Sequence, residues 1–72
     1  MPHAIIKMYP GRSDDIKARL TAEIVKTIKS VLGSSHAAIS VGIEDVAPDD
    51  WDAKVYQPEI AAKPETIFKQ PG

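Results

Sequence analysis

The sequence of 72 residues contains no cysteine, so neither a disulfide framework nor a thiolate metal site is available to stabilise its core. It contains no run of 18 apolar residues, which excludes a typical transmembrane helix. Its first ten residues also lack the charged segment and the long apolar stretch of a signal peptide. We therefore expect a cytoplasmic protein that does not associate with a membrane.

An excess of charge of one sign is also missing. The chain has 9 basic and 10 acidic residues and a formal net charge of −1, which provides no electrostatic footprint for nucleic acid. His3 and His36 are the only histidines, and no carboxylates are spaced around them as metal ligands. The sequence therefore predicts neither nucleic-acid binding nor a metal site.

The length of the chain predicts one small domain, residues 1–72. A domain near this size buries only about 60% of the surface that its unfolded chain exposes. Without disulfides or a metal, oligomerisation is the remaining way to bury more surface. We therefore expect a homo-oligomer, with a homodimer favoured.

The apolar pattern predicts a strand, a helix and a second strand. Residues 3–9 form a short, partly β-branched segment that ends at Pro10 and Gly11, which is typical of a strand followed by a turn. Residues 14–32 carry an apolar stripe at helical spacing, preceded by Ser13 as a cap and followed by Gly33. The stripe consists of Ile16, Leu20, Ile24, Val25, Ile28, Val31 and Leu32.

Residues 38–44 alternate between apolar and polar positions, which predicts a second strand with one face on the helix. A strand, a crossover helix and a strand make the two strands parallel in nearly all cases. The fold class is therefore α+β, built on a β-α-β unit. In the remainder, residues 48–51 resemble a helical turn that carries Trp51, Val55 and Tyr56 suggest a short strand, and prolines divide the tail into short pieces.

Pro2 and Arg12 are the candidate catalytic residues. Removal of Met1 would leave Pro2 as a free secondary amine at the start of the first strand. An amine acts as a general base near pH 7 only if burial or a nearby cation disfavours its protonated form, and Arg12 is such a cation. The competing interpretation is that Met-Pro is a common start without function and that Arg12 is a solvated loop charge.

The arrangement of these residues resembles the 4-oxalocrotonate tautomerase family of the tautomerase superfamily. The resemblance covers Pro2, the first strand, the segment Gly11-Arg12-Ser13-Asp14 that opens the long helix, the second strand and Trp51. The tail, with Pro58-Glu59-Ile60 and Lys69-Gln70-Pro71-Gly72, is similar to the subgroup of p-hydroxyphenylenolpyruvate tautomerase-like proteins.

The resemblance implies a cofactor-free tautomerase or isomerase that acts on 2-oxo acids and their enols. By position, Pro2 matches the catalytic proline of the family, Arg12 matches an arginine that binds the substrate carboxylate, and Trp51 matches an aromatic residue in the wall of the site. A second arginine of the family falls on Ser40, which we keep as a candidate substrate contact. Because one cation is missing, we expect monocarboxylate enols to be preferred over dicarboxylates.

The first strand separates the two candidate catalytic residues. Seven residues at about 3.3 Å each put Arg12 roughly 20 Å or more from Pro2 of the same chain. Antiparallel pairing of the first strands of two subunits would bring Pro2 of one subunit near Arg12 of the other. The sequence therefore predicts active sites shared within a dimer formed through the sheet; the family resemblance also allows a hexamer of three dimers.

Several assignments stay open. His3 and Tyr56 are possible substrate contacts, but an exposed strand position is the favoured explanation for His3, and core packing explains Tyr56 at least as well. The alternative function is a weak or inactive tautomerase-fold oligomer that binds an anionic metabolite or a protein partner. A hydratase or dehalogenase activity ranks lower, because no well-placed carboxylate is available to activate water.

Overall fold

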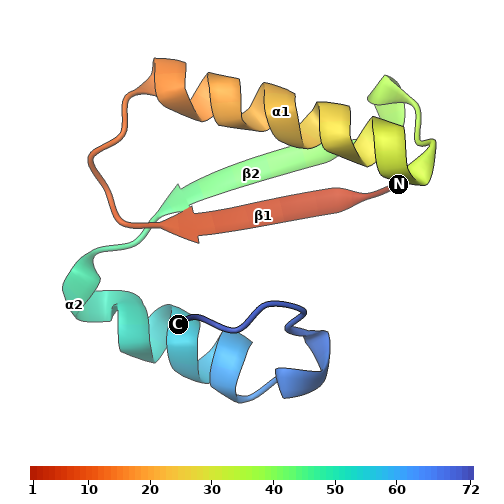
Figure 1. The fold of residues 1–72 in the computed structure, drawn as a ribbon. Coiled ribbons are helices and arrows are strands. Elements are labelled where there is room, and N and C mark those ends of the chain that lie inside the picture. Colours follow the sequence, from red (N-terminus) through yellow and green to blue (C-terminus); the bar gives the residue numbers. More distant parts are fainter.

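A β-α-β unit forms the first two thirds of the computed structural model, which describes residues 1–72 (Figure 1). It consists of β1 (His3–Met8), α1 (Asp14–Leu32) and β2 (Ser40–Asp45), with the short 3₁₀ turn η1 (His36–Ala38) before β2. The strands are parallel, and the register runs from His3 opposite Ser40 to Met8 opposite Asp45. The predicted α+β fold class and the parallel β-α-β unit are confirmed.

The helix α1 has the predicted bounds because its end signals act as expected. The Ser13 side chain accepts a hydrogen bond of 3.2 Å from the Ile16 amide and caps the first turn. At the other end, Gly33 adopts a φ of 71°, a left-handed conformation that glycine reaches without steric cost, and its amide donates to the Lys29 carbonyl.

Both strands differ slightly from their predicted bounds. β1 ends at Met8, so Tyr9 lies outside the ladder and turns toward the C-terminal part of the chain. β2 begins at Ser40 rather than residue 38, because Ala38 belongs to the preceding 3₁₀ turn. These shifts leave the alternation intact. Val41, which lies opposite Ala4 in the register, lines a groove with residues of α1, so His3, Ile5 and Lys7 lie on the other face of the sheet.

The C-terminal arm, residues 48–72, contains no strand. It comprises α2 (Pro48–Trp51), the π-helix η2 (Asp52–Ala61) and the 3₁₀ turn η3 (Pro64–Thr66). The helical turn predicted at Pro48–Trp51 is confirmed, whereas the short strand predicted at Val55–Tyr56 is wrong. The β-propensity of two residues is outweighed by a helix that begins at Pro48 and continues past them, and Pro58, which donates no amide hydrogen, lies within its π-helical part.

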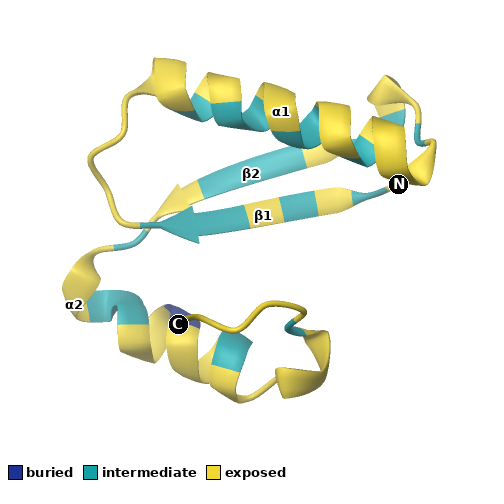
Figure 2. Cartoon of the chain, in the orientation of Figure 1, coloured by how far each residue is buried: buried dark blue, intermediate teal, exposed yellow.

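The single chain buries very little of itself (Figure 2). Val55 is the one buried residue, and the apolar stripe of α1 remains half-buried or exposed, with Val31 at 74% and Leu32 at 64% exposure. The Cα radius of gyration is 13.7 Å, against about 11 Å for a compact domain of this length. The predicted homo-oligomer would cover these exposed apolar side chains. The number of subunits stays a prediction.

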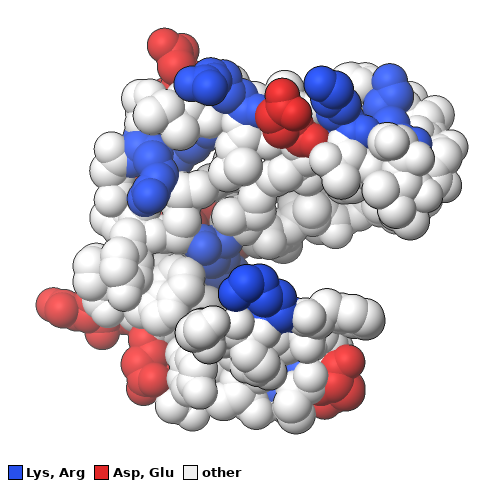
Figure 3. Space-filling model, viewed as in Figure 1, with Lys and Arg blue, Asp and Glu red and all other residues white.

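An open hollow lies between the arm and the β-α-β unit. In Figure 3 the β-α-β unit lies above and the arm below, with a gap between them on the side in view.

None of the helices combines the length and the apolar character that are needed to cross a bilayer.

Candidate active site

The first group of predicted site residues lies where β1 begins. The Ser40 amide donates a hydrogen bond of 3.2 Å to the Pro2 carbonyl and thereby extends the ladder of the sheet by one residue. The Ser40 Oγ lies 2.6 Å from Nδ1 of His3, directly across the two strands. Pro2 thus lies directly before β1 and is hydrogen-bonded to the first residue of β2, with a polar pair of side chains next to it.

The second group lies where β1 ends. Arg12 and Trp51 line one hollow of about 470 Å³ together with Lys7, Met8 and Tyr9. The rings of Tyr9 and Trp51 meet edge to face, with their centroids 5.2 Å apart and an angle of 89° between their planes. This contact fixes Trp51, which the arm supplies, against the end of β1.

Arg12 has no partner of its own within the chain. It forms neither an ion pair nor a side-chain hydrogen bond, whereas Lys7, Lys17 and Lys54 each pair with a carboxylate. Its guanidinium is therefore an uncompensated cation at the edge of an aromatic wall. A planar guanidinium in this state is suited to hold a carboxylate through two parallel hydrogen bonds.

Lys7 is the residue of this hollow that sequence reasoning missed. Its ammonium group pairs with the carboxylate of Glu59 on the arm. The hydrogen bond to Glu59 raises the pKa of Lys7 above its ordinary value, and the nearby charges of Glu59 and Glu44 act in the same direction. Strand alternation could have identified Lys7, because it places Lys7 on the same face of the sheet as His3.

The structure therefore divides the predicted site residues into two groups. It brings Arg12 together with Trp51, and Pro2 together with Ser40, at opposite ends of β1. Tyr56 is 39% exposed and does not line the hollow, so nothing in the single chain associates it with Arg12.

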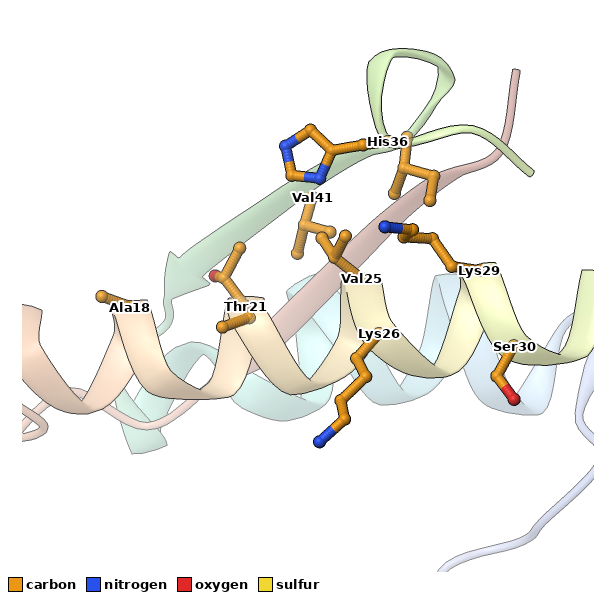
Figure 4. A pocket seen from close by; sticks show the side chains of 10 residues that line it. Ala18, Thr21, Val25, Lys26, Lys29, Ser30, His36 and Val41 are labelled. Carbon is orange, nitrogen blue, oxygen red and sulfur yellow. The ribbon is translucent and has the colours of Figure 1, made fainter. Parts of the chain in front are cut away.

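A larger groove lies elsewhere, between α1 and β2 (Figure 4). It has a volume of about 900 Å³ and is lined by apolar and small side chains with Lys26, Lys29 and His36. None of the residues predicted for the site lines this groove.

No group of three or more histidine, aspartate or glutamate side chains is arranged to hold a metal ion.

Each end of β1 has a distinct chemical capacity. The beginning offers the position of an amine, held by backbone hydrogen bonding, with the hydrogen-bonded side chains of His3 and Ser40 beside it. The end offers a free guanidinium and an aromatic wall, which together can bind an anion that carries an apolar group. These two capacities lie at opposite ends of one strand in the single chain.

Comparison with known proteins finds a matching family and several similar proteins. A family model described as "Tautomerase enzyme" matches residues 2–56. A "Probable tautomerase" of Xylella fastidiosa is 42% identical over 72 residues, an alignment that covers all of this chain and 88% of the relative. Proteins called "Tautomerase PptA" are 40% identical in Klebsiella pneumoniae and 38% in Escherichia coli, in each case over all of this chain and 96% of the relative.

Proposed function

The chain belongs to the tautomerase family, and from this membership we propose that it interconverts the enol and keto forms of 2-oxo acids with Pro2 as the general base. The family predicted from the sequence is confirmed, and with it the enzyme class, an isomerase of the keto–enol tautomerase type. The substrate and the roles of individual residues are the content of the proposal.

In the proposed reaction the Pro2 amine moves a proton between two atoms of the substrate. The neutral amine accepts the proton of the enol hydroxyl group, and the resulting ammonium returns a proton to carbon to give the keto form. One group performs both steps if its pKa lies near the working pH. The hydrogen bond from the Ser40 amide supports this role, because it holds the backbone of Pro2 in register at the start of β1.

Arg12 binds the carboxylate of the substrate and Trp51 covers its apolar part. The observation that carries the proposal is that the unpaired guanidinium of Arg12 and the ring of Trp51 line one hollow. The cation also stabilises negative charge that accumulates in the enolate and disfavours protonation of a neighbouring amine.

The complete site is shared between two subunits. β1 is hydrogen-bonded to β2 along one edge only, so its other edge is free to pair with β1 of a second copy. If the two copies of β1 run antiparallel, the beginning of one lies beside the end of the other. Pro2 of one subunit then faces Arg12 and Trp51 of its partner. Each β1 then has β2 of its own chain along one edge and β1 of the partner along the other.

The experiment compares two substitutions of Pro2 that differ in whether Met1 is removed. Pro2→Ala permits removal and leaves a primary amine at the same position, whereas Pro2→Leu is expected to retain Met1 because of its bulk. Intact mass establishes the N-terminus of each variant. We expect the wild type to tautomerise phenylenolpyruvate and Pro2→Ala to keep part of this activity. The form that retains Met1 should have a kcat about 10²-fold to 10⁴-fold lower.

Full activity of a variant in which Met1 is retained would contradict the proposed base. Absence of turnover in the fully processed wild type, together with binding of anions, would instead favour the alternative of an inactive tautomerase-fold protein that binds an anionic metabolite.

A further inference from the structure

The hollow at the end of β1 contains a second cation whose charge is already compensated. Lys7 lines the same hollow as Arg12, but its ammonium group is paired with Glu59 of η2. Glu59 comes from the C-terminal arm, 52 residues away in the sequence. The hollow therefore holds two basic side chains, of which only Arg12 is free to bind an anion.

We propose that Glu59 is a specificity-determining residue that restricts the site to substrates with one carboxylate by occupying Lys7. The inference rests on the proposed function, in which the hollow binds the substrate anion. With Glu59 ionised, a second carboxylate in the hollow meets a lysine that is already paired. With the charge of Glu59 removed, the ammonium group of Lys7 becomes a second binding point for a dicarboxylate.

The geometry assigns this role to Glu59 rather than to Glu44. Glu44 lies opposite Lys7 in the strand register and lowers the local potential, but it forms no hydrogen bond with Lys7. Glu59 makes the direct contact. Because the side chains of Lys7 and Glu59 keep 25% and 41% of their exposure, solvent screens the pair and a carboxylate ligand can reach the ammonium group once Glu59 is neutral.

Glu59→Gln is the appropriate test because it removes the charge and keeps an amide oxygen that still accepts a hydrogen bond from Lys7. The arm therefore retains a contact with β1 there, besides the contact between Tyr9 and Trp51. Glu65→Gln is the matched control, since Glu65 lies in η3 of the same arm, causes the same change in net charge and forms no ion pair.

Binding of glutarate, a dicarboxylate, and butyrate, a monocarboxylate, would be measured by fluorescence and by calorimetry. Trp51 is the only tryptophan in the chain and lines the hollow, so its emission reports on this site without turnover. We expect Glu59→Gln to tighten glutarate binding about fivefold relative to butyrate, and Glu65→Gln to leave the ratio unchanged. The double variant Lys7→Gln/Glu59→Gln should lose the gain.

A ratio that Glu59→Gln does not change, or that Glu65→Gln changes equally, would overturn the inference. A gain that persists in the double variant would also overturn it, because the second carboxylate would then not depend on Lys7. If glutarate binding responds as expected while no variant turns over an enol, the proposed function fails and the charge selection by Glu59 stands.

Discussion

The two ends of β1 differ in almost every physical respect although the strand is only six residues long. At the beginning, Pro2, His3 and Ser40 are connected by hydrogen bonds and carry no fixed positive side chain. At the end, Arg12 is free and charged beside an aromatic wall. One end is thus suited to place an amine and the other to bind an anion.

The difference follows from the β-α-β connection. In such a unit the chain leaves β1 at its carboxyl end, so the turn that carries Arg12 lies a full strand length from the first residue. The arm follows β2, whose carboxyl end lies at the same side because the strands are parallel, and there Trp51 meets Tyr9. Parallel topology therefore gathers Arg12 and Trp51, the proposed anion-binding residues, at one end and leaves Pro2, the proposed base, at the other.

The largest expected effect comes from breaking the two ends in separate subunits. Arg12→Ala should lower kcat/KM on the order of tenfold to a hundredfold, because a charge-assisted contact is lost. Pro2→Leu, with Met1 retained, removes the other end. In an equal mixture after subunit exchange, half of the dimers are mixed and each has one intact site, so about a quarter of the wild-type activity should return.

Native mass spectrometry checks that mixed dimers form, and circular dichroism checks that both variants fold. If mixed dimers of folded subunits stay as inactive as either parent, the two ends of β1 do not combine across subunits, and the shared-site proposal is wrong.

A smaller effect should appear in the choice of substrate. The end that carries Arg12 offers one free cation. At the other end stands Ser40, where the resemblance places the second arginine of the family. We therefore expect kcat/KM for phenylenolpyruvate to exceed that for 2-hydroxymuconate by about tenfold. Initial rates with the two substrates measure the ratio, and a reversed preference would show that a second cation reaches the site.

The smallest effect concerns the polar pair beside Pro2. Ser40→Ala removes the hydrogen bond to His3 but keeps the backbone contact with Pro2, so we expect kcat to fall about twofold to fivefold with little change in KM. Ser40→Thr, which retains a hydroxyl group, serves as the control and should stay near the wild type. A rise in KM at unchanged kcat would instead assign Ser40 to substrate binding.

Sequence reasoning predicted the parts of the fold that local signals encode. The cap at Ser13 and the left-handed turn at Gly33 gave the bounds of α1, and strand alternation gave β1 and β2 to within about two residues. It failed at Val55–Tyr56, where apolar character over two residues could not distinguish a strand from a helix.

The separation of Pro2 from Arg12 was determined by the sequence alone, because the length of a strand fixes the distance between its ends. Tertiary structure alone decided which side chains join each end. The edge-to-face contact of Tyr9 with Trp51 and the ion pair of Lys7 with Glu59 join positions 42 and 52 residues apart. No periodicity in the sequence specifies such pairs, since they depend on the path of the arm after β2.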